Sequence, residues 1–231
     1  MESPDKATTP IPPALLAATP QQPHLHSPPP EEEQPPTSAP IPPQPAVKIA
    51  VPDVSLADDD TAVARIVSLV NVVYTTTEEG LFAPTYRRTH DAEVRGWLRA
   101  GEMAVAWTEE ESQPTAATIM GCIRFFALTK EVGDFGVLAC DPAYRGTGTG
   151  RRLVGFAEGE CARRGMGRMQ CELLVSREFE HPFKARLQAW YERMGYVVVR
   201  RAEFGGEHPA LARHLVTRAE LRVFEKGLSV V

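Results

Sequence analysis

A run of alternating glycines flanked by arginines is the segment of this sequence best suited to binding a diphosphate. Gly146, Gly148 and Gly150 alternate with threonines, in a segment (141–152) that follows an apolar, strand-like run and precedes a helix-like run. Glycines let a tight loop direct several backbone N–H groups toward one point, and a helix N-terminus adds further unpaired donors. Positive charge suited to phosphate oxygens comes from Arg145, Arg151 and Arg152. The sequence therefore predicts an anion site between a strand and a helix.

The glycine spacing excludes two common nucleotide-binding fingerprints. The G-x-G-x-x-G pattern fails because its third glycine is replaced by Arg151 in one register and by Leu153 in the other. The P-loop pattern fails as well, since no Gly-Lys-Ser or Gly-Lys-Thr follows. Two alternatives stay open at this point, a glycine-rich turn that binds nothing and a regulator that binds another diphosphate.

Hydrophobic periodicity from residue 47 onward predicts the elements that position this loop. Apolar and β-branched runs predict strands at 47–52, 102–108, 118–129, 132–140, 168–175, 196–202 and 217–226. Helical spacing, with N-cap and glycine C′ signals, predicts helices at 60–75, 91–100, 151–164 and 182–194. This order favours an α/β fold in which about four helices flank a mixed sheet of about 6–7 strands. The sheet is expected to be antiparallel at first, with a β-α-β crossover after the phosphate loop.

Two of the predicted helices have a distinct apolar face. The face of the first comprises Val63, Ile66, Val67, Val70 and Val73. The face of the last comprises Phe183, Leu187, Trp190, Tyr191 and Met194. Such stripes are typical of helices that pack against a sheet.

The first 46 residues differ in composition from the rest of the chain. Fifteen of the 21 prolines lie in residues 1–45, which hold no glycine. Proline removes backbone donors, and this composition buries too little apolar surface to offset the entropy of ordering. We expect a disordered, proline-rich tail over 1–46, followed by one domain over 47–231. The run Pro40–Pro43 is a candidate ligand for a proline-binding module, with a solvated tail as the simpler interpretation.

Charge and cysteine usage limit the partners and the compartment. Residues 1–46 hold one lysine and five acids, which accounts for -4 of the net charge of -5 and leaves a nearly neutral domain. Such a domain offers no basic face to nucleic acid. We expect no signal peptide and no membrane span, and a cytoplasmic or nuclear location. The cysteines lack metal-type spacing and are expected to be reduced thiols without a metal, at Cys122, Cys140, Cys161 and Cys171.

Two motifs resemble those of the GNAT superfamily of acyl-CoA-dependent N-acyltransferases. The run 145–150 (RGTGTG) is similar to the family signature R/Q-x-x-G-x-G/A. The run 190–196 (WYERMGY) resembles the aromatic-Tyr-x-x-x-Gly-aromatic segment of the family, and the strand 168–175 lies between the two motifs, as in GNAT proteins. The predicted order of elements also resembles the GNAT fold. The resemblance covers residues 47–228.

The resemblance implies an acyl-CoA, most often acetyl-CoA, as co-substrate, inserted between two splayed parallel strands. The end of one strand would contact the pantetheine and polarise the thioester carbonyl, at Val137, Leu138, Ala139 and Cys140. The N–H groups of the loop would hold the pyrophosphate, at Arg145, Gly146, Thr147, Gly148, Thr149, Gly150 and Arg151. Cys140 is interpreted as a packing residue because no base is placed beside it.

Direct attack by an amine requires two proton transfers. Tyr191 occupies the general-acid position of the family, and a phenol with a reference pKa of about 10 stays protonated at neutral pH. Asp134 is the candidate base, Glu172 is its competitor, and His181 fits an N-cap or packing role better. Lys184 stands where many members carry an asparagine that touches the cofactor. It is expected either to pair with a CoA phosphate or to lie on the surface.

The acceptor site is less constrained by the sequence. In the family, the segment between the first two helices lines this site, which corresponds here to 78–90 with Glu78, Glu79, Phe82 and Tyr86. The connector 203–216, with its two histidines, is a second candidate cover. We favour a small-molecule primary amine as the acceptor. A protein lysine or N-terminal acetyltransferase, a non-catalytic acyl-CoA sensor and a homodimer stay open as alternatives.

Overall fold

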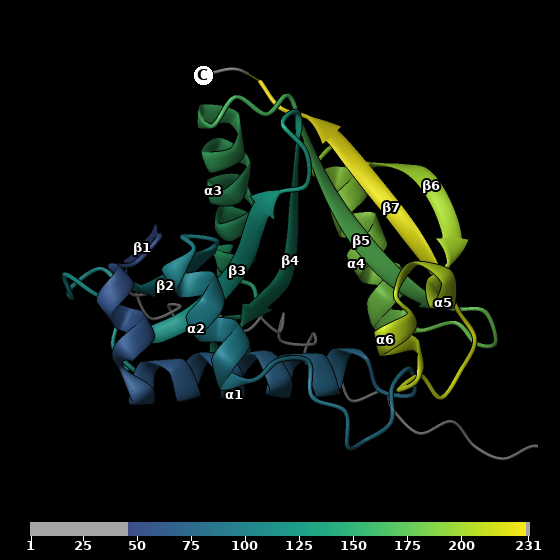
Figure 1. Ribbon diagram of the computed structural model, residues 1–231, viewed down its shortest axis with the longest axis horizontal. Coiled ribbons are helices and arrows are strands. Elements are labelled where there is room, and N and C mark those ends of the chain that lie inside the picture. Colours follow the sequence, from purple (N-terminus) through teal and green to yellow (C-terminus); the bar gives the residue numbers. More distant parts are fainter. Residues whose placement is uncertain (1–45, 230–231) are drawn as a thin grey trace, which may run out of the picture. The chain divides into compact units, whose positions relative to one another are not determined.

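A computed structural model describes residues 46–229 of the chain. The predicted tail, apart from residue 46, and its Pro40–Pro43 run lie outside the described residues. The described part is built on one seven-stranded sheet with helices on both of its faces (Figure 1). The predicted α/β class and the mixed sheet are confirmed.

The sheet has the strand order β1-β2-β3-β4-β5-β7-β6. Its strands are β1 Val47–Ala50, β2 Met103–Thr108, β3 Ile119–Ala127, β4 Val132–Cys140, β5 Arg168–Ser176, β6 Val197–Glu203 and β7 Ala219–Gly227. Only β4 and β5 pair in parallel, and all other neighbours are antiparallel. Parallel neighbours need a crossover, and helix α3 (Thr149–Arg163) supplies it.

The helices begin and end close to the predicted residues. Helix α1 (Asp60–Thr77) begins after Asp59, whose Oδ1 accepts the N–H groups of Thr61 and Ala62 at 2.9 and 3.0 Å. The other long helices are α2 (Asp91–Arg99) and α4 (Pro182–Arg193). Left-handed glycines terminate α2, α3 and α4 as predicted, at Gly101, Gly165 and Gly195 with φ of 65°, 87° and 91°. Among residues 46–229, no helix combines the length and the apolar character needed to cross a membrane.

Three features of the fold were not predicted. Strand β7 lies between β5 and β6, although it is the last strand in sequence. The connector after β6 contains two short helices, α5 (Phe204–Glu207) and α6 (Pro209–Ala212), and a 3₁₀ turn (Val54–Asp58) precedes α1. Four or five residues contain too few periodic positions to reveal a helix in the sequence.

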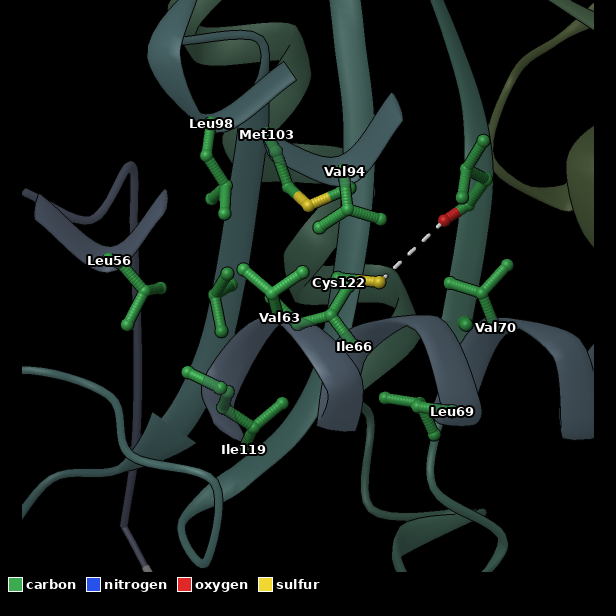
Figure 2. Packing of buried hydrophobic residues seen from close by; sticks show 14 of the residues in the cluster. Leu56, Val63, Ile66, Leu69, Val70, Val94, Leu98, Met103, Ile119 and Cys122 are labelled. Carbon is green, nitrogen blue, oxygen red and sulfur yellow. Dashed lines mark hydrogen bonds between the residues drawn. The ribbon is translucent and has the colours of Figure 1, made fainter. Parts of the chain in front are cut away.

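Helices α1 and α2 cover one face of the first half of the sheet, and α3 covers the other. Figure 2 shows Val63, Ile66 and Val70 of α1 beside Cys122 of β3, and all four are fully buried. The Cys122 thiol donates to the carbonyl of Val137 in β4 at 3.9 Å. The predicted apolar face of the first helix is therefore a core face.

Helix α4, packed on the second half of the sheet, is less completely covered. Tyr191 is buried, whereas Phe183, Leu187 and Trp190 stay partly exposed. These three side chains line a cleft rather than a closed core. Part of the apolar face predicted for this helix is thus available to a ligand.

Candidate active site

The two parallel strands β4 and β5 pair at one end only. Their register runs from Val132↔Arg168 to Phe135↔Cys171 and then stops, and Figure 1 shows the two strands diverging beyond that point toward α1. A cleft of about 690 Å³ is lined by both strands, by α1 and α4, and by the loop that follows β4.

A bulge in β4 coincides with this divergence. Between the paired positions Cys122–Ala139 and Arg124–Gly136, β4 holds one residue more than β3. Within it, Val137 has φ of 51°, a left-handed conformation that is unfavourable for a β-branched residue. Backbone strain of this kind is retained where surrounding structure enforces it, often at ligand sites. The bulge ends the regular ladder where an inserted, strand-like ligand would begin.

The residues predicted to bind the cofactor lie mostly along this cleft. Val137, Leu138 and Cys140 of β4 line it, whereas Ala139 is fully buried in the core beneath α1. Burial raises the pKa of the Cys140 thiol to about 11, which disfavours the thiolate and agrees with a packing role. The loop lines the cleft with Arg145, Gly146, Gly148, Thr149, Gly150 and Arg151.

The loop holds its backbone in a form suited to an anion. Gly146 and Gly148 have φ of 81° and 83°, and among residues 46–229 no backbone carbonyl accepts a bond from either N–H. Asp141 fixes the start of the loop, because its carboxylate accepts the N–H of Ala143 at 2.9 Å and pairs with Arg65 at 2.5 Å. These free donors, with the first turn of α3, fit a diphosphate.

Two side chains of the predicted loop site form hydrogen bonds to backbone carbonyls of the protein. The Arg152 guanidinium donates to the carbonyl of Val47 in β1 at 2.5 Å and does not line the cleft, so its contribution to the anion site stays a prediction. The hydroxyl of Thr147 donates to the carbonyl of Tyr144 at 2.7 Å. That bond stabilises the turn.

Tyr191 reaches the cleft from α4 through a cluster of aromatic rings. Its ring lies 5.7–6.0 Å from the ring centroids of Phe135, Tyr196 and Phe224, and the residue is 5% exposed. No hydrogen bond links its hydroxyl to another described residue. Burial raises the pKa of the Tyr191 phenol well above its ordinary value. The phenol is therefore protonated at neutral pH.

Asp134 lies on β4 at the start of the divergence and lines the same cleft. Its carboxylate accepts a hydrogen bond of 2.9 Å from the amide of Gln170, the residue opposite it on β5. Burial raises the pKa of Asp134 to about 7, assisted by the nearby charge of Glu172 and opposed by the Gln170 hydrogen bond. A carboxyl group with this pKa can exchange a proton at neutral pH.

Glu172, the second candidate base, is paired with a histidine that lies far from it in sequence. Its Oε2 lies 2.8 Å from Nε2 of His208, at the turn between α5 and α6. Both side chains are about one third exposed (31% and 33%), and both residues line the cleft. The histidine of the 203–216 connector thus meets the second carboxylate of the site.

Lys184 is buried, so the surface alternative is wrong, and its pairing with a CoA phosphate stays a prediction. Its ammonium group lies 2.7 Å from Oε1 of Glu78 at the C-terminal end of α1, and the two side chains are 6% and 11% exposed. The pair joins α4 to α1 across the cleft wall. His181 occupies the N-cap position of α4 but makes no capping hydrogen bond, and its Nδ1 is buried without a partner among the described residues.

The two segments considered for the acceptor site meet each other. Phe82 forms a β-bridge with Leu215, and the N–H of Val216 donates to the carbonyl of Leu81 at 3.0 Å. Phe82 also lines the main cleft. Together, the loop 79–88 and the connector 203–216 form a tied cover on the side of the cleft formed by α1 and β5.

Comparisons with known proteins agree with this geometry. The family model described as an acetyltransferase (GNAT) domain matches residues 100–198, which include the phosphate loop and Tyr191. A search of curated proteins by sequence finds no match.

Solved structures share the fold at low sequence identity. The chain is similar to one in the NatC complex bound to Gag peptide and CoA, with a TM-score of 0.54, 17% identity, and coverage of 80% of this chain and 99% of the other. It is also similar to an aminoglycoside 6'-N-acetyltransferase complexed with CoA, with a TM-score of 0.53, 15% identity, and coverage of 74% of this chain and 93% of the other. For yncA from Salmonella typhimurium, solved with acetyl-CoA, the TM-score is 0.52 and the identity 14%, and the match covers 80% of this chain and 95% of the other.

The domain match and the fold agree with the splayed strands and the free N–H groups of the loop. The cleft between β4 and β5 also has room and donors for the acyl donor. Residues 100–198 thus match the model of a GNAT acetyltransferase domain, and the described part of the chain has the fold of acetyltransferases solved with CoA or acetyl-CoA.

Proposed function

We propose that the protein transfers an acetyl group to the primary amine of a small molecule, with Asp134 as the base and Tyr191 as the acid. The observation that carries this proposal is the presence, in one cleft, of a carboxyl group with a pKa of about 7 and a protonated phenol without a hydrogen-bond partner among the described residues. Bound acetyl-CoA supplies the acetyl group as a thioester.

The proton balance assigns one task to each residue. As the amine nitrogen bonds to the acetyl carbon and the carbon–sulfur bond breaks, the Asp134 carboxylate takes the surplus proton from nitrogen. Tyr191 gives its phenolic proton to the leaving sulfur. The strand end at 137–140 orients the thioester, and the N–H groups of the loop hold the pyrophosphate. Glu172, held by His208, is the competing base.

The cover over the acceptor side supports a small molecule rather than a protein chain. An internal lysine on a chain segment that passes through the site needs a groove that is open at both ends. Here the loop 79–88 is tied to the connector 203–216 by a β-bridge, by the bond from Val216 to Leu81 and by one from Ala83 to His214 of 2.8 Å. A compact acceptor therefore fits the site better.

The decisive experiment compares Tyr191→Phe with Tyr196→Phe. Both tyrosines belong to one aromatic cluster, but the Tyr196 hydroxyl donates to Glu158 at 2.8 Å and lies outside the cleft lining. With thiol release measured over a panel of amines, we expect Tyr191→Phe to lower kcat by about 10²–10⁴ and Tyr196→Phe to leave it unchanged. Acetyl-CoA should bind both variants equally in calorimetry. Binding of acetyl-CoA without turnover of any amine would show a sensor instead, and turnover of peptides alone would show a protein acetyltransferase.

A further inference from the structure

Arg88 belongs to the loop 79–88 on the acceptor side of the cleft and has no carboxylate partner among residues 46–229. It lines the main cleft and also a second cavity of about 370 Å³ between the end of α1 and the loop 79–88. We propose that Arg88 binds a carboxylate on the acceptor, so that the substrates are amines that carry a carboxylate group. This inference rests on the proposed transfer to a small amine and specifies its substrate class.

The backbone of Arg88 is held firmly by α1. The side-chain oxygen of Asn71 accepts the N–H groups of Arg88 and Thr89 at 2.7 and 3.3 Å, and its amide donates to the Thr89 carbonyl at 2.9 Å. One half-buried side chain thus fixes two consecutive residues of the loop. A cation positioned in this way loses little further freedom when it binds a ligand.

The guanidinium has an aromatic contact but no counter-ion. It lies 5.1 Å from the ring centroid of Tyr74, its Nε is buried without a hydrogen-bond partner, and among residues 46–229 no carboxylate lies within 4.0 Å of it. The nearest acid on α1, Glu78, is already paired with Lys184. A half-buried guanidinium with an unpartnered Nε gains from a ligand that accepts its hydrogen bonds.

The position of Arg88 points to the acceptor rather than to the cofactor. The two cavities share Tyr74, Glu78, Phe82 and Arg88 in their linings, whereas the phosphate loop lines only the main cleft. The pyrophosphate of CoA has its own donors in the loop. An acceptor amine near Asp134 could therefore place an anionic group toward Arg88.

The surroundings favour a carboxylate over a phosphate. The planar fork of arginine matches the two oxygens of a carboxylate. Glu79, which forms no salt bridge among residues 46–229, also lines the second cavity, and its charge repels a doubly charged phosphate more than a singly charged carboxylate. The same acid attracts the ammonium form of an amine. Complementary charges of both signs thus suit an amino-carboxylate.

The test uses substrate pairs that differ only in the carboxylate. Glycine, β-alanine, 4-aminobutanoate, 6-aminohexanoate and L-phenylalanine are each compared with the corresponding primary amide, because the distance between amine and carboxylate is varied along this series. Thiol release is measured for the full chain. We expect the acid of at least one pair to be the better substrate. Arg88→Met should raise the KM for that acid about 30-fold or more, while KM for the amide changes less than about 3-fold.

Arg87→Met is the matched control. Arg87 is exposed, donates only to the carbonyls of Pro84 and Tyr86 at 3.1 and 3.0 Å, and lines neither cavity. We expect this variant to keep the preference for the acid. Arg88→Lys keeps the charge without the fork and should give an intermediate KM. An unchanged affinity for acetyl-CoA shows that each variant is folded.

The outcomes separate this inference from the proposed function. Equal turnover of acids and amides, or an unchanged preference in Arg88→Met, overturns the inference and leaves amine acetylation standing. If acetyl-CoA binds but no amine reacts, the proposed function fails. Titration of the N-acetylated acids into the CoA complex then decides about Arg88 alone: binding lost in Arg88→Met supports the carboxylate site, and absence of binding overturns it.

Discussion

The two walls of the cleft are built on different principles. The proposed cofactor wall, formed by 137–140 and the loop 141–151, is one continuous segment that would bind mainly through its backbone, where the N–H groups of Gly146 and Gly148 are free of backbone partners among residues 46–229. The acceptor wall is formed by side chains of α1, the loop 79–88, β5 and the connector 203–216, which are held together by Lys184–Glu78 and His208–Glu172. Backbone binding suits a donor that a whole family shares. Side chains from distant segments can vary separately and so define one acceptor.

The strongest test of this comparison is Asp134, which lies on the cofactor strand but is assigned to the acceptor amine. We expect Asp134→Asn to lower kcat/KM by about 10²–10⁴. Because the ionised carboxylate is required, the wild-type kcat/KM should rise as pH increases through about 7. The variant should lose that inflection. An unchanged pH profile would assign the base to Glu172 instead.

The same substitution should have an opposite effect on stability. The folded-state pKa of Asp134 is raised above its ordinary value of 3.8 to about 7, so the folded state binds this proton more tightly than the unfolded state. The contribution of this proton to the free energy of unfolding is complete below pH 3.8, and it is lost as pH rises through 7. In urea unfolding, Asp134→Asn should gain stability relative to the wild type between these pH values.

The next largest effect is expected at the buried pair that joins the walls. Lys184→Met leaves Glu78 buried and unpaired, and should lower the free energy of unfolding by about 3–5 kcal/mol. The double variant Glu78→Gln/Lys184→Met should recover most of this loss in urea unfolding. We expect the acetyl-CoA Kd to change less than about 3-fold, since the ammonium group is already paired. A large increase in Kd with normal stability would assign Lys184 to a CoA phosphate.

A smaller effect is expected from a glycine substitution in the loop, which should weaken cofactor binding without changing acceptor binding. Gly148 has φ of 83° and no atom within 4 Å of an added Cβ, so Gly148→Ala strains only the backbone, by about 1–2 kcal/mol. We expect the acetyl-CoA Kd to rise while the acceptor KM stays constant. Gly155→Ala within α3 is the control, because it also adds a methyl group in open space but at an ordinary helical φ. Equal effects of the two substitutions on Kd would contradict the backbone role of the loop.

The smallest effect is expected at His208, whose pairing with Glu172 is about one third exposed. Such a pair contributes about 1 kcal/mol or less. His208→Gln should therefore raise the acceptor KM by only about 2–5-fold and leave the acetyl-CoA Kd unchanged. The exposed His90, at the start of α2, provides the control substitution His90→Gln. A change in acetyl-CoA binding would show that the connector serves the cofactor wall.

Prediction from the sequence succeeded where the determining interactions are local. The strand, loop and helix around 132–163 follow from periodicity, glycine spacing and helix-end signals, because each depends on neighbours within a few residues. It was less informative for α4, where Phe183, Leu187 and Trp190 show the same pattern whether they line a core or a cleft. Periodicity identifies an apolar face but does not reveal what covers it.

The sequence alone determined the mixed α/β fold, the anion loop and the positions of Tyr191, Asp134 and Glu172 on their elements. Only the tertiary structure decided that burial and the Gln170 hydrogen bond shift the pKa of Asp134. It also decided that Lys184 pairs with Glu78 and that Glu172 pairs with His208. Among residues 46–229, it leaves Arg88 without a counter-ion. The physical reason is that pKa values and ion pairs depend on burial and on distances between segments far apart in the chain. Spacing along the sequence does not encode those distances.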